Sequence, residues 1–299
     1  MKILIIGGSG VIGWNLLEFF KEKNLDVKFT FKTNQVSDNN GYFLDITNKK
    51  ETNEIITKIN PDIVIHTAAL ANVDLCERYK QLAHQINVNG THNIIEGCKK
   101  ISSKIVYIST SFVFSGSSKT YTEHDIPSKP KTNYGLTKLE GEKLVLESGL
   151  ESLILRIDQP YFWKQSWQHT NSVLRVIGTL SKKQELKEIT DWFNVPTYIP
   201  DFVNATYALI KNNYTGIFHL TGSDFISRFE WALNTAKIFD LDSKLLVPIN
   251  SKQLNLDVER NNINMDNKKI LDQTGVKMRG IKEGLLDMQK MNYTEQDKI

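Results

Sequence analysis

Cysteine and long apolar runs are both scarce in this chain of 299 residues. Its two cysteines, Cys76 and Cys98, lack a CxxC spacing, so neither a disulfide framework nor a zinc site is predicted. We expect both to be buried free thiols in a reducing, cytoplasmic protein. Because no apolar run approaches ~18 residues and no signal-peptide pattern opens the chain, we expect no membrane partner.

The chain also lacks a large excess of charge of one sign. The chain has 37 Lys and Arg, of which six are Arg, against 34 Asp and Glu, for a net charge of +3. This balance is too even for a typical nucleic-acid-binding protein, so no nucleic-acid partner is predicted. The six histidines show no ligand spacing, and no metal site is predicted. With 40% apolar and 24% charged residues, the composition is that of an ordinary globular protein.

Strand-like and helix-like segments alternate over the first two thirds of the chain. Strands are expected at 3–6, 27–31, 42–44, 63–65, 105–108 and 153–155, and helices at 12–20, 47–59, 82–100 and 133–147. Thr47 is a candidate N-cap for the second helix. This alternation predicts an α/β fold, a doubly wound parallel sheet of the Rossmann type.

The alternation loosens after about residue 159. We therefore predict an NAD(P)-binding Rossmann domain at 1–160 and a smaller C-terminal α/β substrate-binding lobe at 161–299, partly returning to the main sheet. Within this lobe we expect helices at 201–210 and 228–239 and a strand at 217–220, and fraying at 291–299. The aromatic residues at 161–167 and 192–193 fit core packing better than stacking on a nucleobase.

A glycine-rich turn follows the first predicted strand and opens the first helix. Gly7, Gly10 and Gly13 stand at GxxGxxG spacing. Glycines also make tight turns for structural reasons alone, but this context favours a pyrophosphate that approaches the backbone and the helix N-terminus. The predicted cofactor-binding residues here are Gly7, Ser9, Gly10, Val11, Ile12 and Gly13.

The end of the second predicted strand bears on the choice of cofactor. An acid there would bind the ribose 2′-hydroxyl of NAD, but residues 30–33 contain none. Lys32 could instead meet the 2′-phosphate of NADP, or it is simply a surface lysine. The sequence therefore favours NADP(H), with NAD(H) as the alternative.

Tyr134 and Lys138 form a YxxxK pair, which a helix places on one face. A lysine cation lowers the pKa of a neighbouring phenol, which can then exchange a proton with a carbonyl or hydroxyl group. Thr110 ends a predicted strand upstream, where its hydroxyl could hold the substrate oxygen. The carboxyl ends of parallel strands are where such sheets bind ligands.

Together the segments resemble an extended short-chain dehydrogenase/reductase. The similarity is greatest to the dTDP-4-dehydrorhamnose reductase branch of the NAD(P)-dependent sugar-nucleotide enzymes. It is carried by GGSGVIG at 7–13, LDIT at 44–47, HTAALANVDLCE at 66–77, NVNGTHNI at 87–94, ISTSFVFSG at 108–116, YGLTKLEGE at 134–142 and DWFNVPTYIPD at 191–201.

The resemblance implies roles for individual residues. Thr110, Tyr134 and Lys138 would be catalytic, with Tyr134 and Lys138 also contacting the cofactor. The remaining implied cofactor contacts are Asp45 and Ile46 at the adenine, Ala68 and Ala69 along the cofactor, and Asn87 in support of the site. Spacing alone would make Asp45 a turn residue and Asn87 a helix cap or a satisfied polar group.

The implied function is NADPH-dependent reduction of a 4-keto-6-deoxy sugar nucleotide in carbohydrate biosynthesis. A homodimer is compatible with this resemblance. The branch usually has an acid directly after the catalytic Thr or Ser, where this chain has Ser111. Ser111-Phe112 also replaces the Asp-Glu of the dehydratases, which excludes the elimination of water by that pair.

Other departures fall in the part that reads the substrate, at 156–161 and 260–266, and leave the sugar open. Two rival functions remain. One is an epimerase that oxidises and re-reduces a sugar nucleotide with bound NAD. The other is a non-catalytic NADP-binding regulatory subunit, like the β subunit of methionine adenosyltransferase, which resembles the same branch.

Overall fold

The computed structural model describes residues 1–34, 36, 39–117, 119–254 and 256–291. By its internal contacts the chain divides into two compact units. Unit 1 comprises Met1–Phe114, Pro127–Arg156 and Leu209–Phe218; unit 2 comprises Ser115–Ile126, Ile157–Ala208 and His219–Ile299. The predicted functional division at residue 160 stays a prediction. The fraying expected at 291–299 falls, from residue 292 on, outside the described residues.

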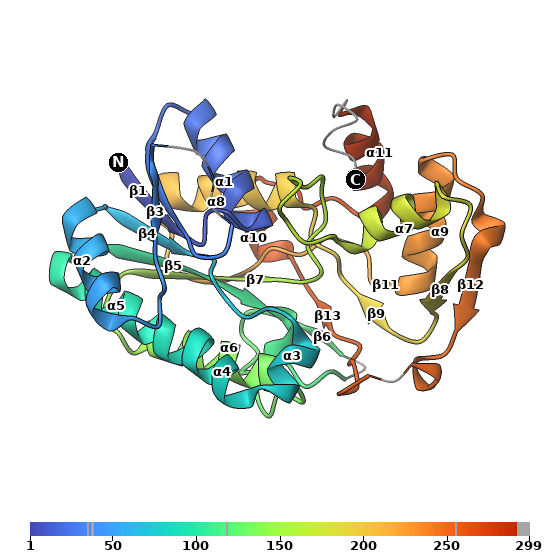
Figure 1. Cartoon of the computed structure of the whole chain (residues 1–299), viewed down its shortest axis with the longest axis horizontal. Coiled ribbons are helices and arrows are strands. Elements are labelled where there is room, and N and C mark those ends of the chain that lie inside the picture. The colour runs from blue at the N-terminus through green and yellow to red at the C-terminus, as the bar shows by residue number, and fades with distance from the viewer. Residues whose placement is uncertain (35, 37–38, 118, 255, 292–299) are drawn as a thin grey trace. The chain divides into compact units, whose positions relative to one another are not determined.

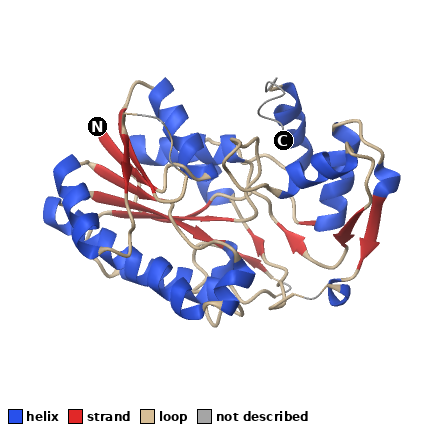
Figure 2. Ribbon diagram, in the orientation of Figure 1, coloured by secondary structure: helices blue, strands red, loops and turns tan. Residues whose placement is uncertain are grey.

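Unit 1 is built around a seven-stranded sheet of order β10-β7-β5-β4-β1-β2-β3 (Figures 1 and 2). Its strands are β1 (Lys2–Ile6), β2 (Asp26–Phe31), β3 (Gly41–Phe43), β4 (Ile63–His66), β5 (Lys104–Thr110), β7 (Ser152–Ile157) and β10 (Gly216–His219). Neighbours from β5 to β3 pair in parallel, with Ile3 opposite both Val27 and Ile63. The strand order reverses at β1 and β4, so the doubly wound fold is confirmed.

Helices cover both faces of this sheet. They are α1 (Val11–Glu22), α2 (Lys49–Ile59), α3 (Val73–Arg78), α4 (Lys80–His84), a π-helical turn (Gln85–Asn89), α5 (Gly90–Ile101) and α6 (Asn133–Leu146), with a 3₁₀ turn at Ser111–Val113. Helices α2, α5 and α6 lie on one face and α1 on the other (Figure 1). Between the sheet and α2, α5 and α6, a continuous apolar core includes Leu4, Val64, Ile56 and Ile94.

The helix expected at 82–100 is present, and the chain is helical without a break from α4 to α5, with the π-helical turn between them. The predicted N-cap Thr47 is wrong. The N-cap of α2 is Asn48, whose side chain accepts a hydrogen bond from the Glu51 N–H. Thr47 instead donates to Asp45, both from its backbone N–H and from its hydroxyl.

Unit 2 contains short strands paired two by two and several helices. The pairs are β11 (Ile226–Ser227) with β9 (Phe193–Asn194), β12 (Leu246–Ile249) with β8 (Leu186–Ile189), and β13 (Asn264–Met265) with β6 (Thr120–Tyr121). The helices are α7 (Ser172–Leu180), most of α8 (Ile199–Lys211), α9 (Arg228–Ile238), α10 (Lys268–Thr274) and α11 (Ile281–Lys290), with 3₁₀ turns at Ser243–Leu245 and Ser251–Gln253. Its core joins α7, α9 and β12 through Val176, Leu180, Ala232, Ala236 and Leu246.

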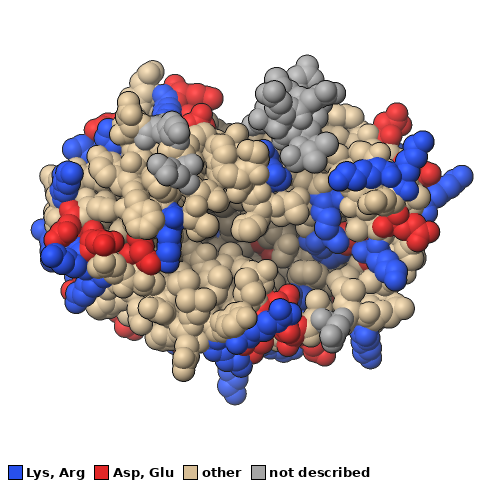
Figure 3. All heavy atoms as spheres, viewed as in Figure 1, with Lys and Arg blue, Asp and Glu red and all other residues tan. Residues whose placement is uncertain are grey.

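Basic and acidic side chains are interspersed over the face of the molecule shown in Figure 3. This agrees with the even charge balance of the sequence. Within the part of the chain that the structure describes, no helix has the length and apolar character needed to cross a membrane.

Candidate active site

The glycine-rich turn joins β1 to α1 under tight steric constraint. Gly7 has φ +89°, and a Cβ added there would lie 2.8 Å from both the backbone N of Ala68 and the Oγ1 of Thr67. A Cβ at Gly13 would lie 2.5 Å from the carbonyl oxygen of Gly7, which brings helix and strand together. These two glycines are therefore required by close backbone approach, as a dinucleotide-binding turn requires.

The N-terminus of α1 remains open in a way that suits a phosphate group. Gly10 is its N-cap, no side chain caps it, and its first turn carries no acid. A Cβ at Gly10 would meet only the carbonyl oxygen of Gly7, at 3.4 Å. The first N–H groups of a helix have no intrahelical acceptor and attract anions, so Val11, Ile12 and Gly13 present donors here. Ser9 is buried within the same turn.

The structure brings Lys32 and Asp45 together, which the sequence analysis did not foresee. Lys32 follows β2, Asp45 follows β3, and Lys32 Nζ lies 2.6 Å from Asp45 Oδ2. The other carboxylate oxygen accepts both Thr47 hydrogen bonds, so Asp45 also acts as a turn residue. Burial works to raise the pKa of Asp45, but the hydrogen bonds from Lys32 and Thr47 hold it below its usual value.

Ile46, predicted to flank the adenine, is buried in the core. A Cβ at Gly90 would lie 2.6 Å from Ile46 Cδ1, so this side chain packs closely against the start of α5. Its carbonyl oxygen accepts a hydrogen bond from Asn93 Nδ2 at 2.9 Å.

Ala68 and Ala69 lie directly after β4, next to the glycine turn. The Ala68 N–H donates to the carbonyl oxygen of Ile6 at 3.1 Å, which ties the ends of β1 and β4 together. These two alanines and the glycine turn thus share one edge of the sheet, where a ligand of an open α/β sheet is expected.

Asn87 sits in the π-helical turn and is almost fully buried. Its Oδ1 accepts from Leu70 N–H at 2.8 Å, and its Nδ2 donates to Leu70 O and Thr137 Oγ1, both at 3.1 Å. Asn87 therefore fastens the loop after β4 to α6. Turns of π-helix frequently occur at functional sites. The residues at 85–89 do not by themselves predict such a turn.

Thr110 ends β5, and Tyr134 and Lys138 lie on α6, which packs against that strand end. Gly135 allows the approach, because a Cβ there would collide with the carbonyl oxygen of Phe112. Thr132 caps α6 by accepting from the Gly135 N–H at 3.0 Å, and the rings of Tyr134 and Phe112 meet edge to face at 5.8 Å. The structure thus gathers the three predicted catalytic residues at the strand-end edge of unit 1.

The three side chains differ in environment. Thr110 is buried and its Oγ1 accepts from the Phe112 N–H, which leaves the hydroxyl proton to be donated. Tyr134 is half-buried. The Lys138 side chain is only 3% exposed, and this burial lowers its pKa to about 7, while the charge of Glu142 acts in the opposite direction. A lysine so poised changes charge near neutral pH.

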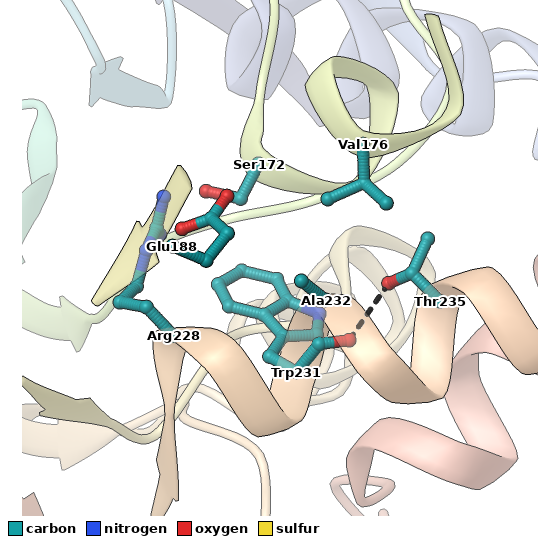
Figure 4. Close-up of a pocket in the computed structure, with 7 residues that line it drawn as sticks. All are labelled: Ser172, Val176, Glu188, Arg228, Trp231, Ala232 and Thr235. Carbon is teal, nitrogen blue, oxygen red and sulfur yellow. Dashed lines mark hydrogen bonds between the residues drawn. The ribbon is translucent and has the colours of Figure 1, made fainter. Parts of the chain in front are cut away.

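Unit 2 holds a recess between α7, β8 and α9 (Figure 4). Its side chains leave essentially no volume that a water molecule could occupy, so it is not a ligand pocket. In Figure 4, Glu188 and Arg228 lie at one end, beside Ser172, and the ring of Trp231 lies between α9 and α7. Its other lining residues are Val176, Ala232 and Thr235. This space is too small to hold a sugar nucleotide.

Comparison with known proteins identifies the family. The RmlD substrate-binding domain family matches residues 1–293. The chain belongs to the RmlD substrate-binding domain family.

The solved structures and relatives to which this chain is similar have two kinds of name. The dTDP-4-dehydrorhamnose reductase of Bacillus anthracis, solved in complex with NADP, is 26% identical with a TM-score of 0.87, covering 98% of this chain and 100% of that one. A dTDP-4-dehydrorhamnose reductase of Clostridium acetobutylicum is 30% identical with a TM-score of 0.85, covering 97% and 99%. The methionine adenosyltransferase 2 subunit beta of Rattus norvegicus is 28% identical, covering 95% of this chain and 87% of its own length.

These findings confirm the resemblance to extended short-chain dehydrogenases/reductases and its closeness to the dTDP-4-dehydrorhamnose reductases. The proteins similar to this chain therefore include a dTDP-4-dehydrorhamnose reductase solved with NADP and a protein named as a subunit of another enzyme.

Proposed function

We propose that this protein reduces the keto group of a 4-keto-6-deoxy sugar nucleotide with NADPH, as a dTDP-4-dehydrorhamnose reductase does. The observation that carries the proposal is the placement of Tyr134 and the buried Lys138 on the face of α6 that meets the end of β5, where Thr110 lies. Proton donor, cation and orienting hydroxyl then share one edge of unit 1 with the glycine turn.

The residues present fit an NADP cofactor. The uncapped N-terminus of α1 suits the pyrophosphate, and Gly7 and Gly13 allow its approach to the backbone. Lys32 supplies a cation at the end of β2, and no acid stands at residues 30–33 to receive a ribose 2′-hydroxyl. We therefore propose NADP(H) as the preferred cofactor. When bound, the reduced nicotinamide supplies the hydride.

The chain's own residues would manage the oxygen of the reacting carbonyl group. The Thr110 hydroxyl donates a hydrogen bond that orients this oxygen. The Tyr134 phenol gives its proton to the oxygen as negative charge develops there. In its charged form, Lys138 lowers the pKa of Tyr134 and so assists that transfer.

A panel of keto-sugar nucleotides with NADPH, followed at the nicotinamide absorbance, tests the proposal. We expect at least one 4-keto-6-deoxy sugar nucleotide to be reduced. Tyr134→Phe should lower turnover by at least the ~10²–10⁴ of general acid catalysis while retaining fold and NADPH binding. Thr110→Val should lower turnover less, because it orients the oxygen rather than moving the proton. Equal turnover in wild type and Tyr134→Phe would refute the assignment of Tyr134.

The relationship to methionine adenosyltransferase 2 subunit beta favours a second candidate function, a non-catalytic NADP-binding regulatory subunit. Ser111 agrees with it, since the reductase branch usually has an acid at that position. In that case wild type and Tyr134→Phe would be equally inert toward every keto-sugar, yet both would bind NADP and a protein partner. An epimerase would instead retain a tightly held NAD and interconvert sugar nucleotides without net NADPH consumption.

The cysteines support a reducing setting. Cys76 and Cys98 are both free and buried, and burial raises the pKa of each thiol to about 12. Both thiols are therefore neutral at pH 7 and poorly reactive. We propose a cytoplasmic location on this basis, and a homodimer stays a prediction.

A further inference from the structure

The ammonium group of Lys138 lies over an aromatic ring that the proposed chemistry does not use. Its Nζ is 3.9 Å from the ring centroid of Tyr107, well inside the ~6 Å range of a cation–π interaction. Tyr107 stands in β5, three residues before Thr110, and is fully buried. Both residues belong to unit 1.

The fold makes room for this ring at α6. Gly141 lies one turn after Lys138, and a Cβ there would collide with the hydroxyl oxygen of Tyr107. That hydroxyl lies 3.5 Å from the carbonyl oxygen of Lys138, to which it donates. The ring is thus held against the helix at the turn that carries the lysine.

The carboxylate one helical turn after Lys138, that of Glu142, already has other partners. Glu142 Oε1 accepts from Ser109 Oγ at 2.5 Å and from Arg156 Nε at 2.9 Å, and its Oε2 accepts from Arg156 Nη2 at 2.7 Å. Arg156 therefore matches the charge of Glu142. The group in direct contact with the Lys138 ammonium is the π face of Tyr107.

We propose that Tyr107 is a positioning residue for Lys138, whose ring holds the buried ammonium in its charged form on the Tyr134 face of α6. This inference rests on the proposed reductase function for its consequence in catalysis, but the contact itself can be tested without turnover. An aromatic face suits this task, since it stabilises a cation without taking its proton.

The charged and titratable groups around Lys138 are few. They are Tyr134 and Glu142 of α6, Tyr107 of β5, His66 of β4 and Arg156 of β7, which pairs with Glu142. Burial and the Lys138 charge lower the pKa of His66 well below its usual value, so His66 is neutral beside the ring. Among the other elements packed on α6, Glu77 of α3 accepts a hydrogen bond from the Asn133 N–H, His84 of α4 lies 3.3 Å from Glu140, and His92 of α5 is exposed.

Carbon-13 NMR of protein labelled at lysine Cε gives the direct test. The resonance that disappears in Lys138→Met identifies Lys138, and a pH series gives its titration midpoint. Tyr107→Leu removes the π face, so the midpoint should fall by about one unit, a tenfold change in the ratio of charged to neutral lysine. Tyr107→Phe keeps the face and should leave the midpoint within a few tenths of a unit.

A matched control separates the contact from a general loss of packing. Phe114→Leu removes another buried ring, which lies 5.0 Å from the guanidinium of Arg156, and should leave the Lys138 midpoint unchanged. A purely structural role for Tyr107 predicts that Tyr107→Leu admits water and raises the midpoint. An unchanged or raised midpoint therefore overturns the proposal. If Tyr107→Leu does not fold, pentafluorophenylalanine at position 107 keeps the ring size, reverses its quadrupole and must lower the midpoint.

Turnover provides the second readout. If a keto-sugar nucleotide is reduced, the alkaline limb of the kcat profile should move down in Tyr107→Leu by the same interval as the NMR midpoint, with KM for the sugar nucleotide unchanged. If the alkaline limb of the kcat profile stays in place while the Lys138 midpoint moves, Tyr107 does not act on the reaction through Lys138. If the wild type reduces no keto-sugar, the proposed function fails, and the NMR arm still decides the contact.

Discussion

Each unit takes an arginine out of water, and the two do so differently. In unit 1, Arg156 is 1% exposed and donates through Nε and Nη2 to both oxygens of Glu142. In unit 2, Arg228 is half-buried between the rings of Trp192 and Trp231, each 5.2 Å away. Its Nη1 donates to the amide oxygen of Gln159 at 3.2 Å.

The difference concerns how much each cation depends on a single partner. Arg156 and Glu142 cancel each other's charge, so removing either one leaves a buried ion alone. Arg228 contacts ring faces and a neutral amide, with the charges of Glu188 and Asp158 nearby. Burial lowers its pKa to about 10, and those two charges offset this only in part. The first arrangement fixes α6 to β7 beside the candidate active site; the second leaves stability less dependent on the cation.

Removing Arg156 should have the largest effect on stability. Arg156→Met leaves the Glu142 carboxylate buried without its counterion, and we expect a loss of about 3–5 kcal/mol in the free energy of unfolding. Urea denaturation measures the change. Glu283→Gln, in the exposed Lys277–Glu283 pair of unit 2, is the control and should change stability by less than about 1 kcal/mol.

Removing both partners sharpens this prediction. In the double variant Arg156→Met, Glu142→Leu neither ion of this pair is left buried without the other, so the variant should be more stable than Arg156→Met alone. Part of the loss should remain, because the Ser109 hydroxyl loses its acceptor. We expect a coupling of about 2 kcal/mol in the double-mutant cycle. Additive losses would show that the pair does not act as a unit.

Sequence reasoning succeeds in unit 1 where a structural rule is local. The strand at 3–6, the turn from Gly7 to Gly13 and the helix beginning at Asn133 each follow from nearby residues, and all three are observed. Because parallel strands end at one edge, the sequence also predicted that Thr110 and Tyr134 would gather there. The roles of these residues in the reaction stay predictions.

Sequence reasoning fails where distant residues decide the structure. Within the π-helical turn, Asn87 forms hydrogen bonds with Leu70 and Thr137, which no local pattern shows. The Lys32–Asp45 pair depends on β2 and β3 lying side by side. The contact between Tyr107 and Lys138 depends on the glycine at 141. In each case the signal is a pairing between segments, which a single sequence does not contain.

Removing Arg228 should affect stability much less than removing Arg156. In Arg228→Met, the thioether can fill the space between the two indole rings, and the desolvation of a cation is relieved. The lost hydrogen bond to Gln159, the lost cation–π contacts and the lost attraction to Glu188 act in the opposite direction, although Glu188 keeps its ion pair with Arg175. We expect a net change within about 1 kcal/mol, measured by urea denaturation. A loss comparable with that of Arg156→Met would break the contrast between the two arginines.

The smallest effect on stability should come from Lys32, a cation that is more exposed than either arginine. Lys32 is 52% exposed and its partner Asp45 is 29% exposed, so the pair should contribute less than about 1 kcal/mol to the free energy of unfolding.

The effect of Lys32 should appear in the choice of cofactor instead. A contact between the ammonium and a 2′-phosphate is worth ~1.5–3 kcal/mol, and competition from Asp45 favours the lower end of this range. Lys32→Ala should therefore reduce the preference for NADPH over NADH about tenfold in fluorescence titrations, whereas Lys100→Ala, at an exposed site on α5, should leave the ratio unchanged. Asp45→Asn should increase the ratio, because it frees the ammonium for the phosphate. Binding of NADH as tight as NADPH by the wild type would refute the assignment of Lys32 and favour the epimerase.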